Sequence, residues 1–171
     1  MTEQTAPASL TAASPELSLD LIITCADGLE APLQTELTSF GIDSEIKSTG
    51  RLAVTGGLRE LYTICLWSRV ASRVLMLIKR KNINAEYDVA EQLYGLAKSV
   101  NWTEQFSLEQ TFAIRLSVDK RVAVSQQFAM LRIKDAIADT FNEVYDSRPN
   151  VDSKNPDFSV FATSKRQANQ T

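Results

Sequence analysis

Cationic side chains are concentrated in one stretch of the sequence, where their chemistry suits an anionic ligand. Residues 59–81 contain six Lys or Arg residues against a single acid, Glu60, which leaves a local excess of five positive charges. Residues 1–46 contain eight acids and no Lys or Arg, so the net charge of −3 for the whole chain hides a strong asymmetry. Dispersed cations of this kind attract phosphate groups, because binding them releases counterions.

The cations that could form such a surface come from three stretches. Two arginines lie one helical turn apart in a predicted helix, and three cations follow in a row where the next predicted strand ends. Others precede or lie on a long helix predicted further along the chain. From the residues alone, the candidate contacts are Arg69, Arg73, Lys79, Arg80, Lys81, Lys120, Arg121, Arg132 and Lys134. The alternative is an ordinary solvated surface whose cations pair with local acids.

The composition argues against several kinds of catalytic and metal site. The chain has no histidine, the residue on which most neutral-pH general bases and most zinc and iron sites rely. Cys25 and Cys65 lie far apart in separate apolar stretches, so we expect two buried, reduced thiols. Asp135 and Asp139 are four residues apart, but Arg132 shares their helix face, which favours a salt-bridged surface. We therefore predict no catalytic residue and no metal site in this chain.

Two short motifs come close to known binding sites. Residues 155–158, NPDF, nearly match the Asn-Pro-Pro-aromatic motif of amino-group methyltransferases, but Asp157 replaces the second proline and no Gly-rich cofactor loop is present. A turn before a strand is the simpler interpretation. The turn CADGLEA could bind phosphate at a helix N-terminus. Asp27 and Glu30 occupy that position and would repel an anion, which also disfavours an acylphosphatase-like enzyme.

The elements that must position the cations begin with the order β-α-β-β-α-β. The apolar run LDLIITCA predicts a strand, and apolar residues recur at helical spacing through residues 29–40. Residues 42–56 alternate as a hairpin that turns at Gly50. Residues 58–73 predict a second helix, and VLMLIK predicts a fourth strand. This order is that of the ferredoxin-like fold, which we assign to residues 19–81.

A second unit, residues 82–163, alternates helices and strands. A helix is predicted over residues 85–100, a strand over 111–118, a helix over 125–146 capped by Ser125, and a strand over 158–163. Two strands make a small sheet, so we expect this unit to be truncated. Residues 1–18 and 164–171 have no apolar periodicity and are predicted to be a flexible tail and a flexible end. The predicted class is α+β.

The chain contains neither a membrane-spanning segment nor a secretory signal by its hydropathy pattern. No stretch approaches the run of about 18 apolar residues that a membrane helix needs. The first residues, MTEQTAPASL, carry no basic start and no apolar core. We therefore predict a cytoplasmic protein with no membrane partner.

Five strings of the sequence carry a resemblance to a known family: TCADGLEAPLQTEL, LWSRVASRVL, NWTEQF, RIKDAI and SRPNVDSKNPDFSVF. Together they resemble the N-terminal region of the bacterial large-subunit ribosomal RNA guanine-N2 methyltransferases. The resemblance implies a ferredoxin-like domain followed by a THUMP domain, an RNA-binding module. It also implies a separate catalytic domain that binds S-adenosylmethionine and is absent from this chain, which would hold no cofactor itself.

The resemblance adds expectations about partner and residues. It implies structured RNA as the partner, in particular large-subunit ribosomal RNA, and it adds Arg148 to the candidate contacts. Trp67 and Trp102 are expected in the core, not as stacking platforms. Arg69 and Arg73 are equally compatible with RNA contact and with pairing to carboxylates. The alternative for the whole chain is a protein-interaction or dimerisation module with no RNA affinity.

Overall fold

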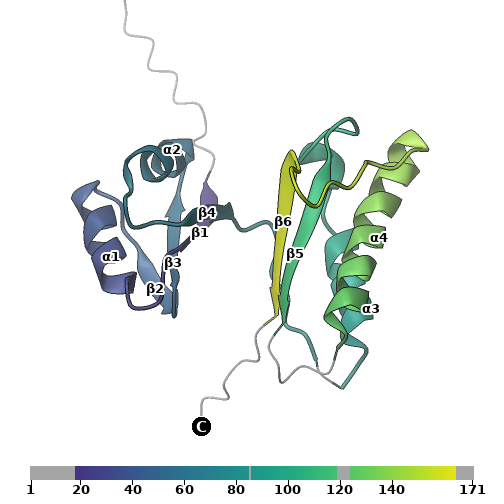
Figure 1. The fold of residues 1–171 in the computed structure, drawn as a ribbon, viewed down its shortest axis with the longest axis horizontal. Helices are drawn as coiled ribbons and strands as arrows, with labels where there is room; N and C mark the ends of the chain where they lie inside the picture. Colours follow the sequence, from purple (N-terminus) through teal and green to yellow (C-terminus); the bar gives the residue numbers. More distant parts are fainter. Residues whose placement is uncertain (1–17, 85, 119–123, 165–171) are drawn as a thin grey trace, which may run out of the picture. The chain divides into compact units, whose positions relative to one another are not determined.

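The computed structural model describes residues 18–84, 86–118 and 124–164, which form two compact units (Figure 1). The units are Met1–Ile78 and Lys79–Thr171. Both contain strands and helices, which confirms the predicted α+β class. The predicted tail and flexible end lie outside the described residues, apart from Ser18 and Ser164.

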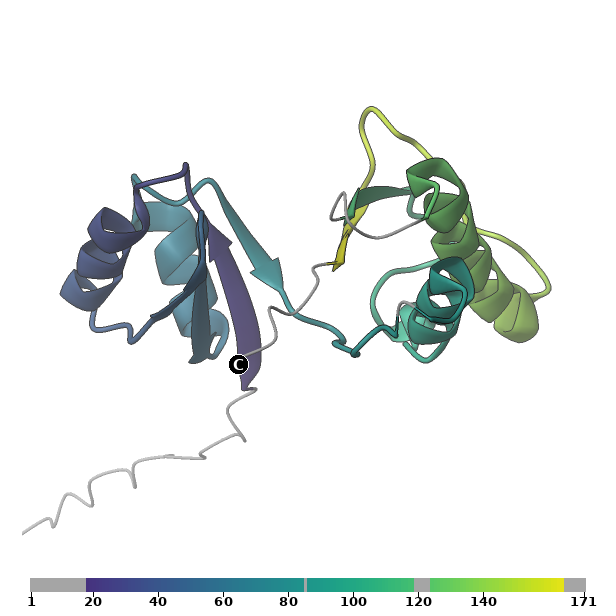
Figure 2. The same ribbon diagram turned by 90° about the horizontal axis from the view of Figure 1, so that it is seen from below.

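The first unit is a four-stranded antiparallel sheet with two helices. Its elements are β1 (Leu19–Thr24), α1 (Glu30–Ser39), β2 (Glu45–Ser48), β3 (Arg51–Gly56), α2 (Leu58–Trp67) and β4 (Arg73–Met76). The strand order is β2-β3-β1-β4, and each neighbouring pair is antiparallel. Both helices cover the same face of the sheet (Figure 2). The predicted ferredoxin-like order is confirmed.

Alternating side chains build the core of the first unit. Leu21 and Ile23 of β1 are fully buried and pack with Leu33 and Leu37 of α1 and Ile64 of α2. Side chains one position along the strand point to the other face of the sheet, because successive residues of a strand alternate. The sheet therefore has one face covered by helices and one face without them.

A glycine is required at the turn between β2 and β3. Gly50 has a φ of +69°, a conformation that other residues rarely adopt. A Cβ atom there would also lie 3.0 Å from the carbonyl oxygen of Cys25. The Gly50 carbonyl accepts a 3.0 Å hydrogen bond from the Cys25 N–H, so the turn lies directly against the end of β1.

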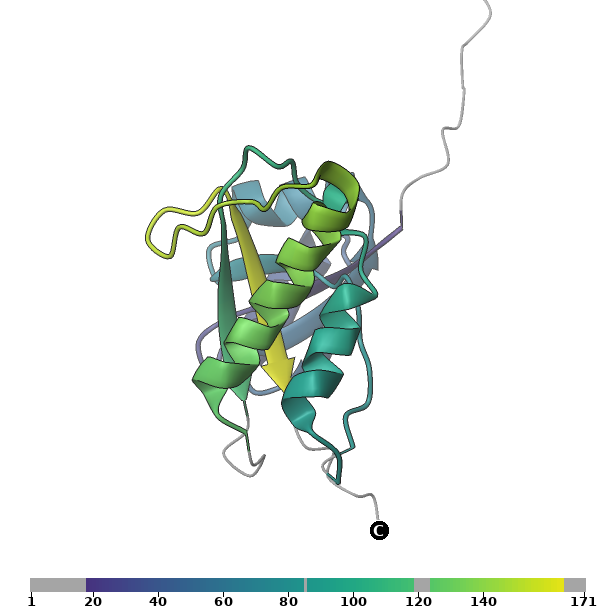
Figure 3. The same cartoon turned by 90° about the vertical axis from the view of Figure 1, so that its right-hand side faces the viewer.

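The second unit joins two parallel strands through a long helix. Its elements are α3 (Val89–Lys98), the short 3-10 helix η1 (Trp102–Glu104), β5 (Phe112–Val118), α4 (Gln126–Tyr145) and β6 (Phe158–Ser164). β5 and β6 pair in parallel from Phe112 opposite Phe158 to Val118 opposite Ser164. α3 and α4 lie side by side over one face of this pair (Figure 3).

Aromatic rings and the apolar stripe of α4 form the core of the second unit. The ring centroid of Phe106 lies 4.8 Å from that of Phe141 and 4.9 Å from that of Phe158. Such offset contacts stabilise a core beyond the area that they bury. The predicted cap of α4 is confirmed, since the Ser125 hydroxyl accepts a hydrogen bond from the Phe128 N–H. The buried face of α4 ends with Phe141, and Val144 near the end of the helix is exposed.

Two expectations about burial are wrong in part. Trp102 is buried and its indole N–H donates a 2.7 Å hydrogen bond to the Ala97 carbonyl, but Trp67 is 70% exposed. Cys25 is only half-buried and Cys65 is exposed. Trp67 and Cys65 are exposed because α2 buries only a narrow face against the sheet. Ile64 is the one fully buried residue of α2.

The burial of α4 predicts a clear difference between two apolar truncations. Ile137→Ala should lower the free energy of unfolding of the second unit by about 3 kcal/mol, because it leaves a cavity in a closed core. Val144→Ala, on the exposed side of the same helix, should change it by less than about 0.5 kcal/mol. Urea unfolding followed by Trp102 fluorescence in a Trp67→Phe background measures both. Equal losses would contradict the burial of Ile137.

Candidate nucleic-acid interface

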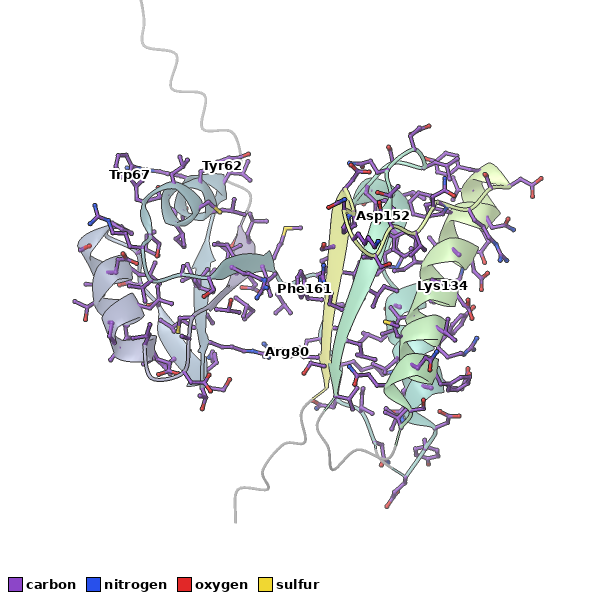
Figure 4. All side chains as sticks on the ribbon, viewed as in Figure 1. Tyr62, Trp67, Arg80, Lys134, Asp152 and Phe161 are labelled. Carbon is purple, nitrogen blue, oxygen red and sulfur yellow. The ribbon has the colours of Figure 1, made fainter. Side chains whose placement is uncertain are left out.

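Three consecutive cations follow the last strand of the first sheet. Lys79, Arg80 and Lys81 lie in the coil between β4 and α3, and all three are exposed (Figure 4 labels Arg80). The strand predicted over residues 74–79 is shorter in the structure. Its pairing with β1 ends at Met76, and the Leu77 N–H donates a last hydrogen bond to the Asp20 carbonyl. Within the described part of the chain, no acid forms an ion pair with any of the three. Their charge is therefore not neutralised locally.

The predicted arrangement of Arg69 and Arg73 on one side of a helix is wrong. α2 ends at Trp67, so Arg69 lies in the loop that follows and Arg73 is the first residue of β4. Both side chains are exposed. The two arginines are therefore positioned by different elements, a loop and a strand.

A carboxylate from α1 binds the loop that follows α2. Glu36 accepts hydrogen bonds from the Ser68 hydroxyl and from the N–H groups of Arg69, at 2.8 Å, and Val70, at 3.4 Å. Partial burial opposes ionisation, but these hydrogen bonds and the nearby Arg69 guanidinium hold the pKa of Glu36 below its ordinary value. Sequence reasoning missed Glu36, because a contact between residues 32 to 34 positions apart leaves no local pattern.

Two arginines of the first sheet lie in one row on the face without helices. Thr24 of β1 is opposite Arg51 of β3 and Arg73 of β4 in the strand register. Register partners in an antiparallel sheet share a face, and the buried neighbour Ile23 points toward the helices. Arg51 was not among the predicted contacts. Leu52 and Val54 alternate in the hairpin, and this pattern places Arg51 on the face without helices. Arg51 could therefore have been predicted from the sequence.

The arginine of α4 is held by acids of its own unit. Arg132 makes two 2.8 Å hydrogen bonds to the two carboxylate oxygens of Glu91 on α3, and it lies 3.8 Å from Asp135. Its guanidinium carbon stands 4.3 Å above the centre of the Tyr94 ring. Hydrogen bonding to Glu91 raises the pKa of Arg132 above its ordinary value. Arg132 therefore serves to join α3 to α4.

Lys134 and Arg148, two other predicted cations of the second unit, are also paired. Lys134 lies 3.7 Å from Asp135, and Arg148 lies 3.5 Å from Asp139. The salt-bridged surface predicted for the two aspartates is thus confirmed. A 3.0 Å hydrogen bond to Asp139 raises the pKa of Tyr94, its donor. Lys120 and Arg121 lie outside the described residues.

Comparison with protein-family models finds two consecutive domains. Residues 20–75 match the RlmL ferredoxin-like domain, and residues 87–167 match the THUMP domain. The chain belongs to the RlmL family. The resemblance seen in the sequence strings is therefore confirmed, as is the order of a ferredoxin-like domain followed by a THUMP domain.

Curated relatives of this RlmL-family chain are ribosomal RNA large subunit methyltransferases K/L. The chain is 91% identical over 163 residues to the protein of that name from Psychrobacter arcticus, and 43% identical over 151 residues to that from Acinetobacter baylyi. The matches cover 95% and 86% of this chain but 21% of each relative. The chain thus spans about a fifth of the length of these relatives.

The fold of the RlmL-family chain is also found in a solved structure. A predicted N6-adenine-specific DNA methylase from Listeria monocytogenes superposes with a TM-score of 0.70 at 23% identity. The match covers 86% of this chain and 37% of that one. At this identity the likeness shows the fold alone.

In the THUMP domain, the near-match to a methyltransferase motif has a structural role. The carboxylate of Asp157 accepts hydrogen bonds from the N–H of Thr111, at 2.9 Å, and from its hydroxyl, at 2.8 Å. These bonds lower the pKa of Asp157 and tie the start of β6 to the start of β5. The predicted turn before a strand is confirmed.

In the ferredoxin-like domain, Glu30 occupies the turn considered as a phosphate site. It accepts hydrogen bonds from the N–H groups of Gly50, at 2.6 Å, and Gly28, at 3.2 Å. The bond from Gly50 is the main reason that the pKa of Glu30 is lowered. A charged carboxylate therefore uses the donors that an anion would need, which agrees with the expected repulsion of a phosphate.

None of the helices in the described residues combines the length and the apolar character needed to cross a membrane. No three potential metal ligands among these residues come together.

Glu36 gives a test of how the arginine-bearing loop is held. Glu36→Gln should lower the free energy of unfolding of the ferredoxin-like domain by about 1 kcal/mol at pH 7, because it weakens charge-assisted hydrogen bonds. A carboxyl group whose pKa is lowered by folding stabilises the folded state fully at pH values above its unfolded pKa of about 4.3. This stabilisation is lost as the pH falls through the folded pKa. The difference between the native chain and the variant should therefore shrink below about pH 4. Urea unfolding followed by NMR amide signals of β1 measures it.

Glu45→Gln is the matched control for this variant. Glu45 forms an exposed ion pair with Lys47 on β2, so its replacement should change the stability by less than about 0.5 kcal/mol at either pH. A loss as large as that of Glu36→Gln, or no pH dependence in the Glu36 difference, would show that the loop is not held by this carboxylate.

Proposed function

We propose that this chain is the RNA-binding region of a methyltransferase that acts on guanine N2 of large-subunit ribosomal RNA. The chain binds structured RNA and presents the target nucleotide to a separate catalytic domain, which binds S-adenosylmethionine and carries out the transfer. The THUMP match and the name shared by the relatives support this proposal. The proposed location is the cytoplasm, where ribosomal RNA is available.

The observation that carries the proposal is the run of three exposed cations for which the described residues supply no acidic partner. Because the charge of Lys79, Arg80 and Lys81 is not neutralised, binding of a phosphate backbone there requires no ion pair to be broken. Binding of this kind reads the shape and phosphate positions of folded RNA with little base readout. Arg69 and Arg73 are exposed as well, and we propose them as further contacts on the first unit.

The remaining candidates are proposed as weaker contacts. Arg132, Lys134 and Arg148 each face an acid in their own unit, so an approaching phosphate must compete with that acid. Lys120 and Arg121 precede α4 in the sequence and stay predictions for the same surface. The expected order of importance therefore begins with the run at residues 79–81.

The salt dependence of RNA binding tests the proposal directly. We expect the affinity for a folded ribosomal RNA hairpin to fall steeply with salt, because cations release counterions from the phosphates. The triple variant Lys79→Ala, Arg80→Ala, Lys81→Ala should reduce the slope of log affinity against log salt by about two to three. Fluorescence anisotropy at four salt concentrations gives these slopes. An affinity of the native chain that is indifferent to salt would rule out phosphate binding.

The double variant Lys47→Ala, Lys154→Ala is the matched control. Both lysines are exposed and lie outside the proposed surface, so their removal should change the slope by less than about one. A change in the control of about two-thirds of that in the triple variant, in proportion to the charges removed, would mean that the binding depends on total charge and not on the run at residues 79–81. Self-association in sedimentation at two concentrations, combined with no RNA affinity, would instead favour the protein-interaction module.

A further inference from the structure

Helix α2 of the ferredoxin-like domain exposes an unusual number of large apolar side chains. Leu58 is 50% exposed, Tyr62 59%, Leu66 76% and Trp67 70%. Cys65 is exposed as well. Exposed apolar residues that are scattered singly need no explanation, but a contiguous group on one helix marks an interaction site.

Four of these residues form a continuous surface, which we call the α2 face: Leu58, Tyr62, Cys65 and Leu66. Their spacing of i, i+4, i+7 and i+8 places them on one side of a helix. Trp67 does not belong to the α2 face, since it follows Leu66 by one position and projects from another side of α2 than Tyr62 (Figure 4). The α2 face is therefore mainly aliphatic.

This composition argues against RNA as the ligand of the α2 face. Nucleic-acid bases stack on aromatic rings or guanidinium planes, and a stacking surface needs such groups side by side. Tyr62 is the one aromatic residue of the α2 face, and two leucines flank it. Leucine offers only apolar contact, which suits the apolar core of a protein interface.

Charge argues against a second copy of the chain. Arg59 is exposed and lies beside Tyr62 and Leu66, at spacings of three and seven residues. The adjacent acid, Glu60, accepts a 2.7 Å hydrogen bond from the Gly57 N–H at the start of the helix, where it is held in place. A symmetric dimer would bring the same surface, with its arginine, against itself. A partner with acidic residues around an apolar patch fits better.

We propose that the α2 face is the docking surface for another part of a full-length protein like the relatives, a part that this chain does not contain. The docking part would present an apolar patch with acidic residues around it. The relatives are matched over 21% of their length, so about four-fifths of their residues have no counterpart here. A surface on the same polypeptide is present at high effective concentration, so even a modest apolar contact is occupied. This inference is independent of RNA binding, because it uses none of the proposed RNA contacts.

Cys65 provides a native reporter for the test, because it lies within the α2 face. The 171-residue chain is compared with a full-length Psychrobacter arcticus relative whose matched 163-residue stretch is replaced by that of this chain. N-ethylmaleimide labelling is followed at the Cys65 peptide by mass spectrometry. We expect labelling of Cys65 to be at least ten-fold slower in the long protein. Cys25, which is half-buried in this chain and lies outside the α2 face, should change by less than two-fold.

Two matched variants identify the surface that is covered. Leu66→Glu in the long protein should restore fast labelling of Cys65, after correction for the effect of the same change in the short chain. Val144→Glu, which alters an apolar residue of α4 that is 59% exposed, should leave the protection unchanged. Leu66→Glu in the short chain should also leave the affinity for the ribosomal RNA hairpin within two-fold. The last result separates this proposal from the RNA-binding function.

Three outcomes would overturn the proposal. Equal labelling rates in the short and long proteins would show that nothing in the longer protein covers the α2 face. Protection of the short chain that grows with its own concentration would point to a second copy. Protection of the short chain by the RNA hairpin would assign the α2 face to RNA instead.

Discussion

In both units, carboxylate side chains accept hydrogen bonds from backbone N–H groups at the turns between elements. Glu30 binds the turn between β2 and β3, Glu36 the loop after α2, and Asp157 the start of β5. Asp88 does the same at the start of α3, where it binds the N–H groups of Ala90 and Glu91. Charged acceptors at such turns stabilise N–H groups that have no partner within a helix or strand. The connections of this protein therefore depend on carboxylate side chains.

This use of the acids decides how the charge of the surface is distributed. In the second unit, Glu91, Asp135 and Asp139 hold the cations of α4 and Arg148, so that surface is electrically balanced. The run at residues 79–81 has no such partner among the described residues, although the chain as a whole is acidic. The net charge of the chain is therefore a poor guide to the ligand of this protein. Whether each cation is paired with an acid is a better guide.

The alternating and helical patterns were enough to predict the elements but not their ends. The core residues of β1 and α4 follow from periodicity, and the Ser125 cap follows from the residue type. The end of α2 does not, and the loop that follows it is bound by Glu36, which is more than thirty residues away in the sequence. The pairing of Arg132 with Glu91 is missed for the same reason, since 41 residues separate them. The prediction that Trp67 lies in the core is wrong, because burial on a narrow helix face cannot be inferred from hydrophobicity alone.

The two sheets differ in how much of the chain must exist before each can close. The ferredoxin-like sheet has all of its strands once residue 76 has been made, whereas β5 remains without its neighbour until β6, beyond a 20-residue helix, has been synthesised. Domains tend to fold as units while the ribosome extends the chain, beginning with the N-terminal one. The first domain can thus be fully formed on a nascent chain whose second domain still presents an open strand.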